Sequence, residues 1–387
     1  MMMRASYSLG RTRSGGVMGR MWACAAAAAT ASITVAAYHV SPGGGAPAKD
    51  LNFSYDASES DLKVSLNPDL TASSFSAQNG YFFANMSKLA YETPGNVEST
   101  LKEMEDCKGL EDNFQWFQSG PGKGDSILGT IRDFIQDTEG FVAANDDVLL
   151  VVFRGTKEPI DWLTNLRGLP RGVRDAWKLD GEGCSIHRGF DDAVSLMWEP
   201  MHKKIKELYG DGKGRKLYIA GHSLGGALAT VAAARLVYED DMNIAGVYTI
   251  GSPRVFDADL ARNFDAKVNH GTPMKDKVFR GRNNNDAITR LPSVPYEHIG
   301  TEIYFDRFGT INTTSFTDRL MGRLSSLLRL SVVDGIDDHD ATAYAHLFKD
   351  AIVASRLSLL AKTKSVIKDA AQKVLPSSGP EKTSDEL

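Results

Sequence analysis

The sequence predicts an α/β fold in which helices cover both faces of a mostly parallel sheet. Helical and strand-like segments alternate after about residue 76, and no internal repeat interrupts them. The strand-like runs are short and mostly apolar, and the run at 148–153 is apolar throughout, as expected for a strand that is buried on both faces. Each later run also follows a helical stretch, which is typical of βα units. We therefore expect one domain over residues 76–362.

The individual elements follow from the spacing of the apolar residues. Helical spacing occurs in 81–91 and again in 97–104. Two strands are predicted at 141–144 and 148–153, and the turn-forming residues 145–147 between them indicate a hairpin. The later strands are predicted at 217–220, 245–250, 277–280 and 302–305.

The regions outside this domain differ from it in composition. We expect residues 1–48 to be a signal peptide or anchor with its linker, 49–75 an irregular polar lead, and 363–387 a flexible tail that ends in SDEL. The first 49 residues contain five basic side chains and no acidic one, whereas the whole chain has a net charge of −5. The body of the chain is therefore acidic, which argues against binding to nucleic acid.

Both ends of the chain resemble targeting signals. Arginines precede the uncharged segment 21–40, and small, turn-forming residues follow it, which is the order of a secretory signal. The segment is also long enough for an uncleaved membrane anchor, and its arginines are compatible with an organelle transit peptide. The last four residues, SDEL at 384–387, resemble endoplasmic-reticulum retrieval tetrapeptides, although a polar tail can end this way without a receptor. We expect residence in the endoplasmic reticulum lumen through a retrieval receptor.

The cysteines allow one possible disulfide within the expected domain. Without the cysteine in the predicted signal, Cys107 and Cys184 remain, and they can form a disulfide or stay as two buried thiols. No Cys-x-x-Cys pair or His/Cys cluster predicts a metal site. We therefore expect neither a metal nor another cofactor.

A candidate nucleophile lies between a predicted strand and a predicted helix. The strand at 217–220 runs into Gly221-His222-Ser223-Leu224-Gly225, and an alanine-rich helix follows. The pattern G-x-S-x-G is weak alone, but strand, sharp turn and helix together are what a nucleophile elbow requires. The glycines allow strand and helix to approach closely, and the helix amino terminus points its free N–H groups at the serine. We expect Ser223 to be a nucleophile.

Further blocks around this elbow occur in the order of a known family. They are FRGT at 153–156, DWLTNL at 161–166, HRGF at 187–190, GSPRV at 251–255 and NDAITRLP at 285–292. Over about residues 76–360 the chain resembles the class 3 (fungal-type) lipases of the α/β-hydrolase superfamily. The resemblance implies the α/β-hydrolase fold with a lid segment, and hydrolysis of lipid esters.

A serine nucleophile needs a histidine base and an orienting carboxylate, which follow the serine as acid and then histidine in this superfamily. Asp286 lies after the predicted strand 277–280, where α/β sheets carry their sites, and it matches the Asn-Asp block of the family. Asp257 and Asp259 are alternatives that lack the motif. Asp286 is therefore the predicted acid.

His339 is the predicted base, because it matches the late histidine of the family, with a tyrosine five residues on. His346 lies two helical turns further along a helix expected to begin at His339, so both would share a face and His346 stays an alternative. His298 is expected to be a hydrogen-bonded core histidine. His187 and His222 are expected to be structural.

The resemblance also indicates an oxyanion hole and a lid. The expected donors are the N–H of Leu224 and the N–H and hydroxyl of Thr156. Arg154 is expected to anchor the loop that carries Thr156. Between Thr156 and His187 lies an amphipathic segment that can cover an acyl cleft or pack permanently. Its apolar residues, taken as the lid, are Ile160, Trp162, Leu163 and Leu166.

These features predict a serine carboxylic-ester hydrolase that acts on acylglycerols at a transient membrane or lipid-droplet surface. Two alternatives are a lipid acyltransferase with the same triad and a non-catalytic lipase-fold binding protein. The presence of Ser223, Asp286 and a late histidine together argues against the non-catalytic alternative.

Overall fold

The computed structural model describes residues 64–105, 108–119, 138–156, 170–173, 175–179, 183–312 and 338–374. These ranges all belong to one compact unit, Val64–Leu387. Within them, no helix combines the length and the apolar character needed to cross a membrane. The predicted signal segment 21–40 and the tetrapeptide 384–387 lie outside the described residues, so location in the endoplasmic reticulum stays a prediction.

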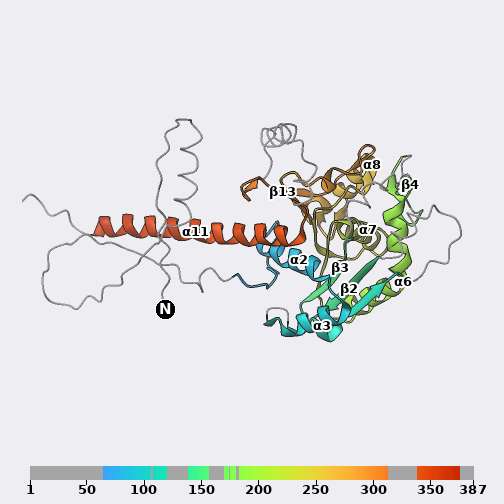
Figure 1. Cartoon of the computed structure of the whole chain (residues 1–387), viewed down its shortest axis with the longest axis horizontal. Coiled ribbons are helices and arrows are strands. Elements are labelled where there is room, and N and C mark those ends of the chain that lie inside the picture. The colour runs from blue at the N-terminus through green and yellow to red at the C-terminus, as the bar shows by residue number, and fades with distance from the viewer. Residues whose placement is uncertain are drawn as a thin grey trace, which may run out of the picture. The chain divides into compact units, whose positions relative to one another are not determined.

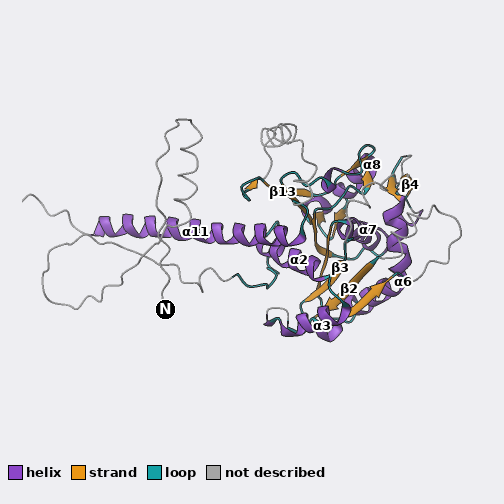
Figure 2. Cartoon of the chain, viewed as in Figure 1, coloured by secondary structure: helices purple, strands orange, loops and turns teal. Residues whose placement is uncertain are grey.

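A mostly parallel sheet of eight strands runs through this unit (Figure 2). Its spatial order is β1-β2-β3-β6-β7-β11-β13-β14. The strands are β1 Gln115–Gln118, β2 Glu139–Ala144, β3 Val148–Phe153, β6 Lys216–His222, β7 Ile244–Ile250, β11 Val278–Asn283, β13 Thr301–Phe305 and β14 Ile311–Asn312. The run from β3 to β13 is parallel, and β1, β2 and β14 pair antiparallel at the edges. The predicted fold class is confirmed.

Helices cover both faces of this sheet. They are α2 Ala77–Leu89, α3 Pro94–Glu103, α6 Arg188–Tyr209, α7 Leu224–Glu239, α8 Ala258–Ala266 and α11 Ala341–Val374. Strand β3 has apolar side chains on both faces of the sheet. Leu149 and Val151 pack in one cluster with α6, α7 and α8, whereas Leu150 and Val152 pack in another with α2 and α11. An entirely apolar strand therefore has both faces buried. On the second face, α2 and α11 lie side by side (Figure 1).

Smaller elements lie around the main sheet. A four-stranded sheet has the order β12-β8-β5-β4, formed by β4 Pro170–Gly172, β5 Ser185–His187, β8 Phe256–Asp257 and β12 Tyr296–Glu297. A two-stranded hairpin is formed by β9 Val268–Asn269 and β10 Thr272–Pro273. Single 3-10 turns occur at η3 Glu111–Asn113, η4 Asp175–Trp177, η5 Met274–Asp276 and η6 Ile288–Arg290.

Two expected boundaries differ from the structure. The lead before α2 is irregular, but Phe75 packs into the core, with its ring 5.8 Å from that of Phe279. At the other end, α11 continues to Val374, so the domain boundary expected at residue 362 falls inside a helix. Cys184 is a buried free thiol, and Cys107 lies outside the described residues.

Candidate active site

Ser223 occupies a strained turn between strand β6 and helix α7. Its φ of 58° and ψ of −128° lie in a region that non-glycine residues rarely adopt, and the residue is fully buried. The glycines on either side make the turn possible: a Cβ atom on Gly221 would collide with the backbone of Gly225, and one on Gly225 with that of Phe153. Ser223 therefore lies between the end of β6 and the amino terminus of α7.

His339 and Asp286 complete a hydrogen-bonded chain with Ser223. The Nε2 atom of His339 lies 2.8 Å from Oγ of Ser223. Its Nδ1 atom lies 3.0 Å and 2.9 Å from the two carboxylate oxygens of Asp286. All three residues are buried. This geometry lets the imidazole accept the serine proton while the carboxylate stabilises the resulting imidazolium.

The carboxylate of Asp286 is held by two further donors. The backbone N–H of Ile288 donates to Oδ1 at 2.9 Å, and the hydroxyl of Tyr344 donates to Oδ2 at 2.6 Å. Burial, together with the nearby Asp286, raises the pKa of Tyr344 well above its usual value, so the hydroxyl keeps its proton. The tyrosine five residues after His339 therefore contacts the acid.

The turn that carries His339 is tied to the loop that carries Asp286. Asn283 donates through its side chain to the carbonyl of Asp338 at 2.9 Å. The side chain of Asn284 and the backbone N–H of Asn285 both donate to Oδ2 of Asp338 at 3.1 Å. Asp338 thereby holds the histidine turn against the acid loop, a role that no sequence motif indicated.

The alternative residues lie elsewhere. Asp257 caps α8 by accepting from Leu260, and Asp259 is an exposed partner of Arg262. His346 is exposed on α11. Because α11 begins at Ala341, His339 precedes the helix, and the expectation that both histidines share one helical face does not apply.

His222, next to the nucleophile, links two distant segments to the site. Its Nε2 atom lies 2.6 Å from the carbonyl oxygen of His339, and its Nδ1 atom 2.7 Å from the hydroxyl of Tyr91. A carbonyl only accepts, so Nε2 carries the proton and Nδ1 accepts from the tyrosine. Burial, with the adjacent His339, holds the pKa of His222 well below its usual value. His222 is thus neutral and structural, and sequence reasoning did not find its partner Tyr91.

The other predicted structural residues also have identifiable contacts. His298 donates from Nε2 to the carbonyl of Thr289 at 2.6 Å, which confirms a hydrogen-bonded histidine. His187 is buried at the start of α6, with its ring 4.2 Å from that of Phe190. Neither contact involves Ser223.

Leu224 directly follows Ser223 in the chain, and the residue before Thr156 lies against Ser223. Leu224 is the first residue of α7, so its N–H has no acceptor within the helix. Thr156 directly follows Gly155, where a Cβ atom would lie 3.1 Å from Cβ of Ser223. Arg154 holds this loop through an ion pair with Glu139 and a 2.9 Å backbone hydrogen bond to the same residue. The loop after β3 therefore runs against the nucleophile.

The predicted lid and the question of a metal site do not involve the triad. The lid residues Ile160, Trp162, Leu163 and Leu166 fall outside the described residues, so their role stays a prediction. Among the residues that the structure describes, no group of histidine, cysteine or acidic side chains has a metal-binding arrangement.

A comparison with models of known protein families finds a match in the central part of the chain. Residues 150–296 match the family described as lipase (class 3). That range includes Thr156, Ser223, Leu224 and Asp286 and ends before His339.

Curated relatives carry lipase names. The secreted mono- and diacylglycerol lipase A of Penicillium cyclopium is 30% identical over 176 residues, which are 44% of this chain and 52% of the relative. The triacylglycerol lipase OBL1 of Nicotiana tabacum is 35% identical over 114 residues, or 27% of this chain and 19% of the relative. The chain thus spans about half the length of the Penicillium relative.

Solved structures of similar proteins include fungal lipases. The triacylglyceride lipase of Rhizomucor miehei aligns with a TM-score of 0.48 and 19% identity, covering 68% of this chain and 94% of that one. A mutant form of a Penicillium cyclopium protein designated MDLA aligns with a TM-score of 0.43 and 23% identity, covering 62% of this chain and 83% of that one.

Proposed function

We propose that the chain, whose residues 150–296 match the class 3 lipase family, is a serine carboxylic-ester hydrolase that cleaves lipid esters. The observation that carries the proposal is the hydrogen-bonded chain from Ser223 through His339 to Asp286, with the serine in a strained elbow. Relatives named for mono-, di- and triacylglycerol lipases favour acylglycerols as the substrate class.

The proposed reaction begins with attack of the Ser223 oxygen on the ester carbonyl. His339 accepts the serine proton at Nε2, and Asp286 stabilises the imidazolium through Nδ1. Negative charge develops on the carbonyl oxygen, where the N–H of Leu224 and the donors of Thr156 would stabilise it. His339 then returns the proton to the leaving alcohol.

Deacylation repeats these steps with water. His339 removes a proton from the water, which attacks the acyl group on Ser223 and releases a fatty acid. An alcohol in place of water would give acyl transfer by the same steps, so analysis of the products separates the two reactions. The amphipathic segment between Thr156 and His187 supports a proposal that the enzyme works at a membrane or lipid-droplet surface.

The test is labelling of the full chain by a fluorophosphonate probe, combined with a panel of acylglycerol and p-nitrophenyl esters. Ser223→Ala should abolish labelling and hydrolysis, because only an activated serine reacts with the probe. Ser252→Ala is the matched control, since this buried serine beside the elbow donates to the carbonyl of Pro253. Equal labelling of wild type and Ser223→Ala would refute the proposal.

A further inference from the structure

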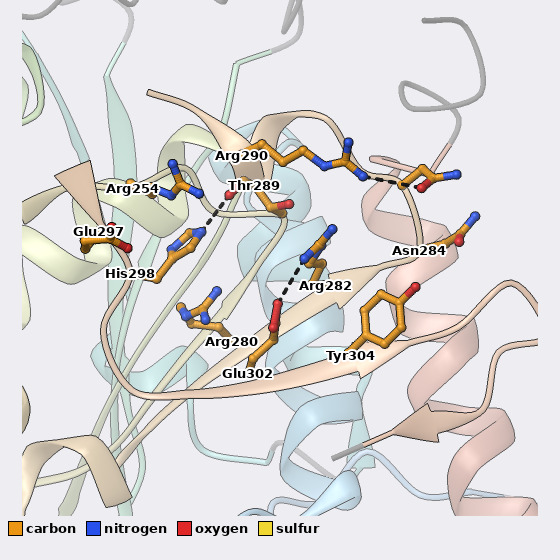
Figure 3. Close-up of a pocket in the computed structure, with 11 residues that line it drawn as sticks. Arg254, Arg280, Arg282, Asn284, Thr289, Arg290, Glu297, His298, Glu302 and Tyr304 are labelled. Atoms are coloured by element: carbon orange, nitrogen blue, oxygen red, sulfur yellow. Dashed lines mark hydrogen bonds and ion pairs between the residues drawn. The ribbon is translucent and has the colours of Figure 1, made fainter. Parts of the chain in front are cut away.

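A cavity of about 360 Å³ lies beside the carboxyl ends of β11 and β13, and it contains none of Ser223, Asp286 and His339 (Figure 3). Four arginines line it, and we call it the arginine pocket: Arg254, Arg280, Arg282 and Arg290. Its volume falls within the range of about 300–1,000 Å³ that is usual for small-molecule sites.

The alternation of residues along β11 creates this pocket. Phe279 and Gly281 face the core beneath α11, whereas Arg280 and Arg282 point to the opposite face of the sheet. The parallel register places Glu302 beside Arg280 and Tyr304 beside Arg282. Arg254, from the loop after β7, and Arg290, from the 3-10 turn η6, lie on the other side of the cavity (Figure 3). Guanidinium groups from three separate segments thus converge on one space.

Positive charge in the pocket exceeds negative charge. The four guanidinium groups are accompanied by two carboxylates, those of Glu297 and Glu302, and Glu297 is exposed. The pKa of His298 is well below its usual value, because of burial and then of Arg280, so this side chain is neutral. The lining residues therefore carry about two excess positive charges, which the nearby carboxylate of Asp265 reduces to about one, while the whole chain has a net charge of −5.

The arginines also repel one another. Burial lowers the pKa of Arg280 to about 10. Glu302 and Asp265 oppose this shift, whereas the neighbouring Arg282 and Arg254 add to it. Moving several guanidinium groups out of water is unfavourable unless anionic partners compensate for it. An additional anion would supply that compensation.

Unused hydrogen-bond donors indicate where an anion would bind. Within the described part of the chain, the buried Nε atoms of Arg254 and Arg282 have no hydrogen-bond partner. The side-chain hydrogen bonds of these residues are long, at 3.3 Å from Arg282 to Glu302 and 3.3 Å from Arg254 to the carbonyl of Pro292. The two Nε atoms are themselves shielded from solvent, so the capacity for an incoming acceptor lies with the weakly bonded terminal nitrogens of the two arginines.

We propose that the arginine pocket binds the phosphate group of a phosphomonoester. A phosphate carries about −1.5 to −2 charges near neutral pH and offers three acceptor oxygens, which suit a positively charged pocket that is rich in N–H donors. Several guanidinium groups around one centre suit a tetrahedral dianion better than a single carboxylate, which one arginine can satisfy. The remaining volume accommodates a small organic group. The phosphate belongs either to a soluble phosphate ester or to a lipid headgroup.

The site is separate from the proposed acyl chemistry. Asn285 and Thr289 line the pocket and flank Asp286, whose carboxylate faces His339. The acid loop therefore has the pocket on one side and the triad on the other. Binding of a phosphate ester would be detectable whether or not the chain hydrolyses esters.

Calorimetric titration of the full chain with glycerol 3-phosphate, at constant ionic strength, tests the proposal. Arg282→Gln should weaken binding by about tenfold or more, because it removes a charged donor. Glu297→Gln should strengthen binding, since it removes an exposed carboxylate from the rim. Arg262→Gln is the matched control, because this arginine is 72% exposed and paired with Asp259 on α8. Opposite shifts in two variants would not arise from damage to the fold.

Flotation with phosphatidylcholine vesicles, with and without phosphatidic acid, distinguishes the two sources of phosphate. Retention that requires both phosphatidic acid and Arg282 identifies a lipid headgroup, and titration without retention identifies a soluble ester. If Arg282→Gln fails to fold, the same binding measurements on Glu297→Gln and Arg254→Gln test the proposal. The proposal is wrong if wild type binds neither probe, or if the folded pocket variants bind as wild type does.

Discussion

Gly251 shows how closely the triad is packed. Its φ is +60°, and a Cβ atom there would lie 2.9 Å from the ring of His339 and 3.0 Å from Oδ2 of Asp286. We expect Gly251→Ala to lower kcat by about a hundredfold, because a displacement of about 1 Å at the base is enough for such a loss. Gly271→Ala controls for backbone strain, since Gly271 has a φ of +89° and open space around it. Similar kcat values for the two variants would contradict this interpretation.

The two late histidines give a second prediction. His339 touches both Ser223 and Asp286, whereas His346 is exposed on α11. His339→Ala should therefore lower kcat by about 10⁴-fold, while His346→Ala should keep nearly all activity. Steady-state hydrolysis of a p-nitrophenyl ester measures both values. A large loss in His346→Ala alone would assign the base to that residue instead.

At the level of elements, a buried ion pair joins α6 to α7, the helix that begins beside Ser223. Arg235 donates to the carboxylate of Asp191 at 2.5 Å and to its carbonyl at 2.9 Å, and both side chains are buried. Arg235→Ala should lower the free energy of unfolding by about 3–5 kcal/mol, because it leaves a buried carboxylate without this partner. Urea denaturation measures the loss.

An exposed ion pair provides the control for that measurement. Lys213 pairs with Asp146 at 2.6 Å in a solvent-exposed position. Lys213→Ala should leave the unfolding midpoint unchanged, because water and salt screen such pairs. If both variants unfold at the same urea concentration as wild type, the ion pair between α6 and α7 does not stabilise the fold.

For the whole molecule, the buried His222 and the partly buried His298 predict a loss of stability in acid. The pKa of His222 is lowered by burial and His339, and that of His298 by burial and Arg280. Below pH 6.5, the ordinary value, the unfolded chain gains protons that the folded chain does not bind. The free energy of unfolding should therefore fall as the pH falls below 6.5, by about 1.4 kcal/mol per pH unit for each histidine.

His298→Gln tests this origin of the acid sensitivity. The Gln amide carries an N–H donor at the position of Nε2, which donates to the carbonyl of Thr289, but it does not titrate. Urea denaturation across this pH range should give a shallower dependence in the variant than in wild type. An unchanged slope would show that His298 does not contribute.

Local patterns in the sequence were sufficient for the sheet and the elbow. The run at 148–153 is apolar at every position, and the structure buries both of its faces. The strand, turn and helix around Ser223 are neighbours in the chain, so their arrangement depends on short-range sterics that one sequence displays. Helix ends were less predictable: α2 begins at Ala77 because Ser76 caps it, four residues before the apolar spacing starts.

Contacts between segments that are distant in the sequence could be identified only from the tertiary structure. The hydrogen bonds from His222 to Tyr91 and to His339 span 131 and 117 residues. Asp338 meets the asparagines before Asp286 across more than 50 residues. The choice of His339 over His346 depends on where α11 begins. The arginine pocket depends on the register of β11 with β13. Such placements result from packing of the whole chain, because hydrogen bonding and burial act on distance in space, and spacing along the sequence does not specify that distance.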